Sequence, residues 1–183
     1  MSRLIIINLE DTDMVLSPDR FTEQAQEVIA ASQEILNRYR HNQWDCEHLF
    51  LALIEQEKGV PSEIFSTLGV NLQVLHANLH SYLEEDDKVA GQANQIFITP
   101  RLSELFGRAD DEAKRLNDEF IGTEHILIAL TEEDTGVSAD LLSSFNVTTE
   151  EVYRALQSIR GSHRTVSYTH LRAHETLRYL VCR

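Results

Sequence analysis

The sequence has few of the residues that build cross-linked or strand-rich folds. It contains two cysteines, three prolines and seven glycines in 183 residues. Two cysteines are too few for a disulfide framework, and they are typical of a reducing compartment. Runs rich in Val, Ile and Tyr are almost absent, whereas Leu, Ala, Glu and Gln are plentiful, which favours helices. We therefore expect an all-α protein, built as one domain or as two small repeats that share a core.

Long hydrophobic segments are also missing. The apolar segment at residues 4–7 is four residues long, and Glu10, Asp11 and Asp13 follow it closely. This segment is too short for the core of a signal peptide or for a membrane span. The sequence therefore predicts a cytoplasmic protein.

Positive charge is scarce. There are 16 Lys and Arg residues against 30 Asp and Glu residues, which gives a net charge of −14. Nucleic acids and anionic membrane surfaces are both bound through clustered Lys and Arg side chains. We therefore expect neither a nucleic acid nor a membrane among the partners of this chain.

Sequence motifs of several enzyme classes do not occur. The chain has no Gly-Lys pair, so it has no phosphate-binding loop of the form G-x-x-x-x-G-K-[ST]. It also has no G-x-S-x-G motif, in which a nucleophilic serine would sit on a strand-to-helix turn. We expect no catalytic residue and no nucleotide site in this chain.

The histidines give only weak evidence for a metal site. Glu-His occurs at residues 47–48 and again at 124–125. Adjacent residues on a helix point about 100° apart, so such a pair chelates one metal poorly. His76 and His80 are four residues apart, but that spacing alone is weak evidence. We expect no metal; each glutamate would favour the dipole of its helix N-terminus, and each histidine would pack there.

An internal repeat is the strongest signal in the sequence. Residues 22–75 align without gaps to residues 99–152, which lie 77 positions later. Glu-His and Gly-Val pairs recur at this offset, and conservative apolar pairs fill the positions between them. Such a pattern predicts a duplicated helical unit whose two copies bury a common core.

Each copy is predicted to contain four helices. In the first copy they cover about residues 22–39, residues 45–58 with Gly59 as C-cap, residues 61–68 before Gly69, and a segment capped by Asn71. In the second copy, Thr99-Pro100 begins the first helix and Thr123 caps the second, while the last ends at Gly161. We place repeat one at residues 19–84, a linker at 85–98 whose residues 96–98 dock on the core, and repeat two at 99–161.

This pattern resembles the double Clp repeat of Clp N-terminal domains. The resemblance is carried by Asp19-Arg20-Phe21-Thr22-Glu23, Glu47-His48-Leu49, Thr99-Pro100-Arg101 and Gly122-Thr123-Glu124-His125-Ile126-Leu127. Within the family, His41-Asn42-Gln43 and residues 155–162 resemble ClpB-type members. ClpC-type members usually have Gly-Thr-Glu-His where this chain has Asp45-Cys46-Glu47-His48.

The resemblance implies a function. Such domains are joined by a flexible linker to a hexameric AAA+ ring, where they engage unfolded or aggregated polypeptides and pass them to the pore. ATP and Mg²⁺ would then belong to the parent protein, and the isolated domain would be monomeric. Two alternatives remain open: an N-domain of a ClpC-type unfoldase that binds adaptors or phosphorylated arginine, and a stand-alone helical interaction protein.

The resemblance also predicts a client-binding surface at the helix starts. The matching positions are Thr22, Glu47, Asp118 and Glu124, where a carboxylate could bind Arg or Lys side chains by charge-assisted hydrogen bonds. Phe21 and Phe120 could accept apolar client side chains. Capping or solvation is the alternative role for each carboxylate, and core packing is the alternative for the two phenylalanines.

The two ends of the chain do not fit the family pattern. Residues 1–18 are predicted to form a disordered extension, with Met14 as a plausible natural start. From about Val166 onwards the tail at 162–183 changes character, and residues 167–176 resemble translated vector sequence. We therefore interpret the chain as a truncated fragment with an artificial end.

Overall fold

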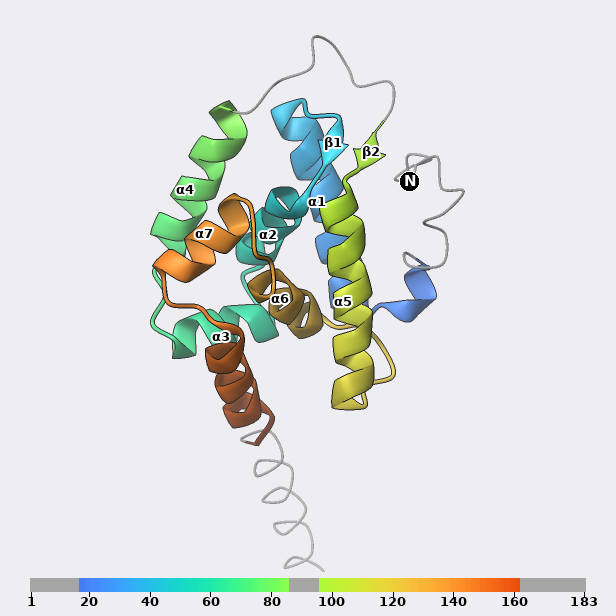
Figure 1. The fold of residues 1–183 in the computed structure, drawn as a ribbon, viewed down its shortest axis with the longest axis vertical. Helices are drawn as coiled ribbons and strands as arrows, with labels where there is room; N and C mark the ends of the chain where they lie inside the picture. The colour runs from blue at the N-terminus through green and yellow to red at the C-terminus, as the bar shows by residue number, and fades with distance from the viewer. Residues whose placement is uncertain (1–16, 86–95, 162–183) are drawn as a thin grey trace, which may run out of the picture.

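The computed structural model describes residues 17–85 and 96–161, and its elements fall into two similar sets (Figure 1). The first set is η1 (Pro18–Arg20), α1 (Glu23–Tyr39), β1 (Gln43–Trp44), α2 (Cys46–Glu55), α3 (Val60–Thr67) and α4 (Leu72–Glu85). The second set is β2 (Phe97–Ile98), α5 (Pro100–Leu116), α6 (Thr123–Thr131), α7 (Val137–Ser144) and a C-terminal helix at residues 149–161. The prediction of an all-α fold with four helices in each repeat is confirmed.

Two short parallel strand pairs relate the repeats by a pseudo-twofold axis. Phe21 pairs with Ile121, and Ile98 pairs with Trp44. Ile98 is the equivalent of Phe21 in repeat two, and Trp44 is the equivalent of Ile121 in repeat one. Exchanging the two repeats therefore converts one pair into the other, as a twofold operation requires. The backbone N–H groups of Thr22 and of its equivalent in repeat two donate to the carbonyls of Ile121 and Trp44, each over 3.0 Å. The start of each repeat is thus fixed to the segment that precedes the second helix of the other repeat.

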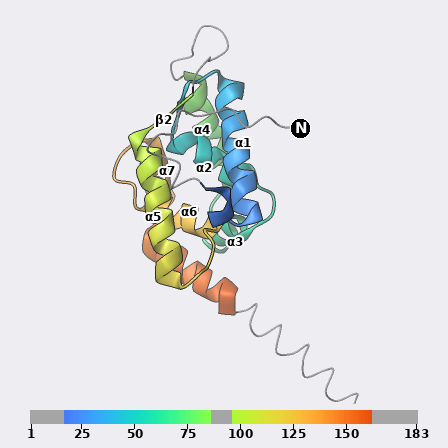
Figure 2. The ribbon, with the colours of Figure 1, turned by 90° about the vertical axis from the view of Figure 1, so that its right-hand side faces the viewer.

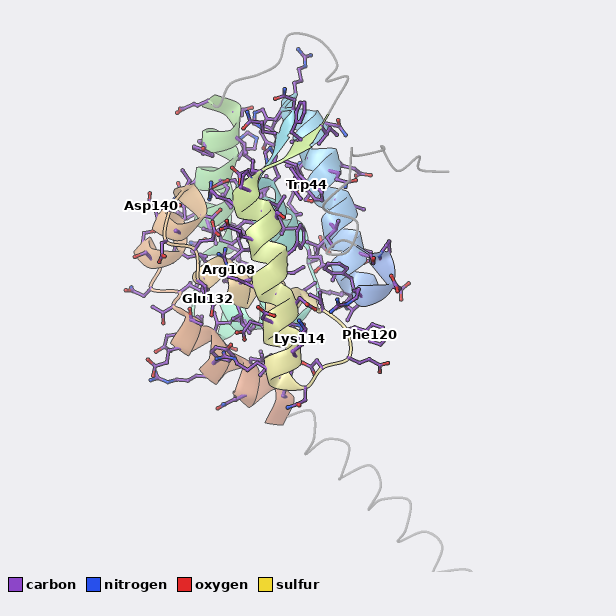
Figure 3. The ribbon with its side chains drawn as sticks, turned by 45° about the vertical axis from the view of Figure 1, so that its right-hand side comes forward. Trp44, Arg108, Lys114, Phe120, Glu132 and Asp140 are labelled. Carbon is purple, nitrogen blue, oxygen red and sulfur yellow. The ribbon has the colours of Figure 1, made fainter. Side chains whose placement is uncertain are left out.

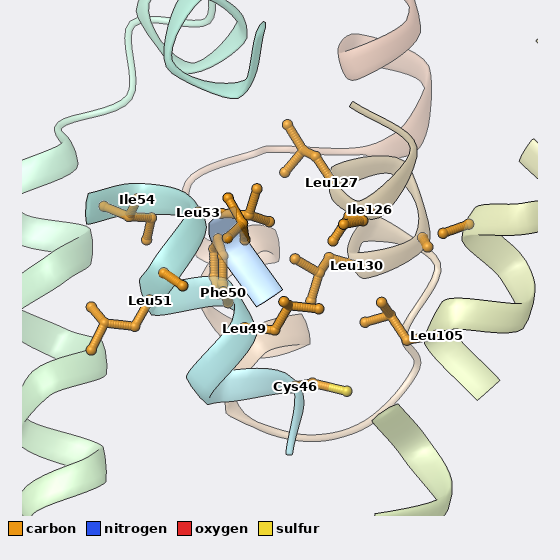
Figure 4. Close-up of a cluster of buried hydrophobic side chains, with 14 of the residues drawn as sticks. Cys46, Leu49, Phe50, Leu51, Leu53, Ile54, Leu105, Ile126, Leu127 and Leu130 are labelled. Atoms are coloured by element: carbon orange, nitrogen blue, oxygen red, sulfur yellow. The ribbon is translucent and has the colours of Figure 1, made fainter. Parts of the chain in front are cut away.

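The second helices of the two repeats form the centre of the core. Figure 2 shows α2 and α6 between α1 and α5; α1 packs on α2, α5 packs on α6, and the two central helices contact each other. A helix that is apolar on all sides is one that is buried on all sides, and Figure 4 shows side chains of α2 facing those of α6. Burying each large apolar side chain contributes roughly 1.5–3 kcal/mol. Fully or almost fully buried are Leu49, Phe50, Leu51, Leu53, Ile126, Leu127, Ile128 and Leu130.

The long first helices begin and end in the same way. Thr22 caps α1 by accepting from the Ala25 N–H over 3.2 Å, and its counterpart in repeat two caps α5 over the same distance. After α1 the backbone turns left-handed at Arg40, with φ of 61°, and after α5 it does so at Asn117, with φ of 57°. These residues are 77 positions apart, so the duplication extends to the stereochemistry of the turns.

Two predicted caps are wrong. The second helix ends at Glu55, and Gly59, with φ of 143°, is the N-cap of α3 instead of the C-cap of α2. A glycine with positive φ ends one helix or begins another, and the sequence alone did not distinguish these roles. Likewise Gly122, not Thr123, is the N-cap of α6. Gly122 is the residue that aligns with Asp45, the N-cap of α2.

The predicted docking of residues 96–98 on the core is observed for two of these three residues. Ile96 is buried and Ile98 is half-buried, but the side chain of Phe97 is 51% exposed. Alternation along a short strand explains this difference, because neighbouring side chains point to opposite faces. Residues 86–95, the N-terminal segment 1–16 and the tail 162–183 lie outside the described residues, as do the predictions made for them, whereas Pro18 begins η1. Among the described residues, no helix is both long enough and apolar enough to span a membrane.

Candidate functional site

A histidine caps the second helix of each repeat. His48 Nδ1 accepts from the backbone N–H of Asp45 over 3.2 Å, and His125 Nδ1 accepts from that of Gly122 over 2.8 Å. In a neutral ring, accepting at Nδ1 leaves the proton on Nε2. His48 Nε2 then donates to His41 Nδ1 over 2.9 Å, and His125 Nε2 faces a carboxylate instead. These histidines, which were expected to pack at the helix starts, act there as capping groups.

The start of α2 carries a partly buried ion network, which we call the Glu47 corner (Asp45, Glu47, Arg101, Arg108 and Glu133). Arg101 Nη2 lies 3.1 Å from Glu47 Oε1, and its Nη1 lies 3.2 Å from Asp45 Oδ2. Its Nε also donates to Glu133 over 3.2 Å, and Arg108 pairs with the same carboxylate. Burial alone would lower the pKa of Arg101, but the charge and hydrogen bond of Glu47 and the charge of Asp45 together outweigh it and raise that pKa. The corner therefore contains its own counter-ion.

The start of α6 carries a second acidic cluster, the Glu124 corner (Asp118, Glu124, His125 and Arg160). Arg160 Nη2 lies 2.6 Å from Asp118 Oδ2 and 3.1 Å from Glu124 Oε1. Asp118 Oδ2 also accepts from His125 Nε2 over 3.0 Å. Burial would lower the pKa of Arg160, yet its hydrogen bonds to both carboxylates raise it above the ordinary value. These acids hold a guanidinium that is itself 39% exposed.

The six residues predicted for the client surface divide between these places. Asp118 and Glu124 share Arg160 at the Glu124 corner. The backbone N–H of Thr22 donates to the carbonyl of Ile121, three residues before Glu124, and Phe120 lies on the loop that leads to α6. Phe120 is 45% exposed and lies at the edge of the molecule in Figure 3.

The other two predicted residues lie elsewhere. Phe21 is in the core, 3% exposed, with its ring centroid 5.9 Å from that of Phe106, so its alternative role in packing is the one observed. Glu47 belongs to the other corner, where its side chain is 3% exposed. Its partners are different residues from those of Glu124.

Two arginines that hold the acids were not named as site residues. Arg101 is 54 residues from Glu47, and Arg160 is 36 residues from Glu124. Neither has a local spacing that would pair it with a carboxylate. The available signal was that Arg101 stands in the Thr99-Pro100-Arg101 motif and Arg160 in residues 155–162, two segments that carry the family resemblance.

The acids of the Glu124 corner and His125 are close enough to suggest a metal site, because one ligand atom from each lies within 4.8 Å of the others. The geometry of His125 opposes that role. Its Nδ1 lone pair is used by the Gly122 N–H, and its Nε2 carries a proton directed at Asp118. A metal needs a nitrogen lone pair, so binding one here would break the cap of α6. The arrangement suits a cationic side chain better.

Comparison with known proteins identifies the family. Residues 20–145 and 120–175 match the Clp repeat (R) N-terminal domain. The chaperone protein ClpB of Bacillus anthracis is 30% identical over 162 residues, covering 87% of this chain and 19% of that protein. ClpB 1 of Synechocystis sp. is 32% identical over 160 residues, covering 87% of this chain and 18% of that protein. The chain thus spans about a fifth of the length of these relatives.

Solved structures show the same fold. The Hsp104 N-terminal domain of Candida albicans superposes with a TM-score of 0.67 at 16% identity, covering 78% of this chain and 92% of that one. The N-domain of ClpV in complex with a VipB peptide gives a TM-score of 0.63 at 16% identity, covering 85% and 94% of the two chains. With its duplicated helices, cross-paired repeats and matched sequence, this chain belongs to the Clp repeat N-terminal domain family.

Proposed function

We propose that this chain is the client-binding N-terminal domain of a ClpB-like chaperone, and that it takes cationic and apolar side chains of unfolded or aggregated polypeptides at the Glu124 corner. The observation that carries the proposal is that Asp118 and Glu124 together hold one exposed guanidinium, that of Arg160. A client arginine would replace Arg160 and make the same bonds.

The surroundings of the corner support an unfolded client. Phe120, half-exposed and two residues from Asp118, offers an apolar contact beside the acids. Thr22 lies on the other strand of the Phe21–Ile121 bridge, and its hydroxyl caps α1. One pair of acids and one exposed ring would bind many different sequences weakly, which suits a client ensemble.

The parent protein belongs to the same proposal. The remaining four-fifths of a ClpB-like chain would supply the AAA+ modules, their ATP and Mg²⁺, and a hexameric ring in the cytoplasm. The isolated domain would be a monomer that binds clients without nucleotide or metal. Sequencing the gene beyond codon 161 tests this: ATPase modules support it, and a stop codon would favour a stand-alone interaction protein.

The client site is tested by titrating a fluorescein-labelled peptide that contains Arg and Leu into the chain and into Asp118→Asn/Glu124→Gln. Loss of charge-assisted hydrogen bonds worth roughly 1.5–3 kcal/mol should weaken binding about 10- to 100-fold. The matched control is Asp140→Asn, which removes an exposed carboxylate on α7 and should leave the affinity unchanged. Equal affinity of all three proteins would contradict the proposal.

Adaptor docking is the second candidate, and one observation favours it. The related ClpV N-domain was solved with a VipB peptide, which is a defined sequence and not an unfolded ensemble. A defined partner would bind with a strong sequence preference. Scrambling the labelled peptide at constant composition separates the two readings, since a client site tolerates the change and an adaptor site does not.

A further inference from the structure

The two corners are pseudo-equivalent, but their guanidinium groups are held very differently. Arg101 uses three nitrogens, Nε, Nη1 and Nη2, to contact the carboxylates of Glu133, Asp45 and Glu47, and it also donates to the carbonyl of Thr135 over 3.2 Å. At the other corner, the guanidinium of Arg160 contacts the carboxylates of Asp118 and Glu124 through one nitrogen, Nη2. More bonds in a fixed planar fork make an arginine harder to displace.

The repeat explains why the corners differ. The residue 77 positions before Arg101 is Gln24, so the second corner has a neutral amide where the first has a guanidinium. The residue equivalent to Ser138 is Pro61. The Ser138 N–H lies 3.4 Å from Glu47 Oε1, but a proline has no N–H to offer the equivalent Glu124.

Packing places Gln24 at the Glu124 corner in the position that Arg101 occupies at the Glu47 corner. Helix α3 packs on α6 as α7 packs on α2. A Cβ on Gly136, before α7, would collide with the guanidinium of Arg101. A Cβ on the equivalent Gly59, before α3, would lie 3.9 Å from Gln24 Oε1. The amide thus reaches the same loop as the guanidinium does in the other repeat.

Burial of the two glutamates follows these differences. The side chain of Glu47, enclosed by Arg101 and the start of α7, is 3% exposed, whereas that of Glu124 is 17% exposed. A carboxylate can be buried only when hydrogen bonds and a counter-charge replace its water. Glu47 has the guanidinium of Arg101 as counter-charge and the N–H of Ser138 as a further donor.

We propose that Arg101 is a built-in ligand that closes the Glu47 corner, so that a client guanidinium is accepted at the Glu124 corner alone. The residue at position 24 is then what leaves that second corner open. The part of this inference that concerns client binding rests on the proposed function, while the filling of the Glu47 corner by a guanidinium does not.

The first test closes the open corner. Gln24→Arg places a guanidinium at the position equivalent to Arg101 and leaves Asp118 and Glu124 unsubstituted. Binding of the Arg- and Leu-containing peptide should weaken at least about tenfold. The control is Ala30→Arg, which adds the same charge at another exposed position of α1. Equal affinities of the two variants would overturn the inference.

The second test empties the closed corner and does not depend on clients. Arg101→Ala removes the guanidinium that contacts three carboxylates, so its melting temperature should fall. Methylguanidinium at millimolar concentration should then raise the melting temperature of Arg101→Ala by several degrees, and that of the unmodified chain hardly at all. Methylammonium at equal ionic strength is the control. An equal response of both proteins to both cations would show that no guanidinium site exists there.

The outcomes separate the two proposals. If the unmodified chain fails to bind the peptide, the proposed function falls, and the methylguanidinium experiment still decides whether Arg101 fills a ligand site. If the peptide binds but Gln24→Arg behaves like Ala30→Arg, the inference falls and the proposed function stands. Should Arg101→Ala not fold, Gln24→Arg decides the question alone.

Discussion

His125 Nε2 lies 3.0 Å from Asp118 Oδ2, and this contact joins the cap of α6 to the proposed client site. The same ring accepts the Gly122 N–H at Nδ1 over 2.8 Å, so the side chain that fixes the helix start also orients the carboxylate. At the equivalent position in repeat one, Asp118 is replaced by His41, whose Nδ1 lies 2.9 Å from His48 Nε2. The duplication thus preserves a buried hydrogen bond while it changes the charge of the acceptor.

This contact predicts that two substitutions of Asp118 will differ in stability. Asp118→Ala leaves the buried Nε2–H of His125 without its acceptor, which should cost about 1–3 kcal/mol. Asp118→Asn retains an oxygen that can accept this proton and should cost clearly less. Urea unfolding of both variants measures the difference, and equal losses would show that the hydrogen bond contributes little.

Trp44 provides a second prediction, about a buried polar pair. The indole is fully buried, and its Nε1–H donates to Ser32 Oγ over 3.1 Å. Ser32→Ala should therefore reduce the free energy of unfolding by about 1–3 kcal/mol, because the indole N–H loses its partner. The chain has one tryptophan, so its fluorescence follows unfolding directly. Ser66→Ala, at an exposed position of α3, is the control and should change stability by less than about 0.5 kcal/mol.

Glu132 predicts a pH dependence of stability. Partial desolvation, and after it the nearby charge of Glu112, raises the pKa of the Glu132 carboxyl, although the residue as a whole is exposed. A carboxyl with a raised pKa in the folded state favours folding when protonated, so its contribution is present at low pH and lost as the pH rises through that pKa.

Glu132→Gln should therefore gain stability relative to the unmodified chain as the pH rises from 4 to 7. We expect a gain on the order of a few tenths of a kcal/mol, because water screens this exposed side chain. Urea unfolding at both pH values measures it. A variant that is less stable than the unmodified chain at pH 7 would contradict the sign.

Cys46 should be protected from thiol reagents. It is a free cysteine with no exposed surface, and burial raises the pKa of its thiol, so little thiolate forms. Reaction with iodoacetamide requires opening of the core and should be at least about a hundredfold slower than in urea-unfolded chain. Peptide mass spectrometry distinguishes Cys46 from Cys182. Rapid labelling of Cys46 in the folded protein would show that α2 opens easily.

The helices could be predicted because their signals are local. The apolar stripe of α1 repeats at helical spacing, and Thr99 and Asn71 cap their helices as the sequence indicated. The misplaced caps at Gly59 and Thr123 concern short connections, where several residues compete for one role. The alignment of the repeats does favour Gly122 over Thr123 as the N-cap of α6, since Gly122 aligns with Asp45, the N-cap of α2.

The location of the residues in the proposed client surface was less predictable than the fold. Phe21 and Phe120 look alike in the sequence, yet one is in the core and the other is half-exposed. Their different fates follow from the cross-pairing of the repeats, in which Phe21 faces Phe106 of the second repeat. No pattern within either repeat contains that information.

The sequence by itself determined that there are two copies of a four-helix unit. The periodicity of apolar residues is a local signal, and the constant offset of 77 is found by comparing the sequence with itself. Only the tertiary structure decided which of the twin glutamates is enclosed. Glu47 is buried because an arginine 54 residues away and the start of α7 converge on it, whereas among the described residues Glu124 has one ion-pair partner, Arg160, and its side chain stays 17% exposed. A charged group is buried or left in water according to the partners that folding brings to it, and these partners lie far away along the chain.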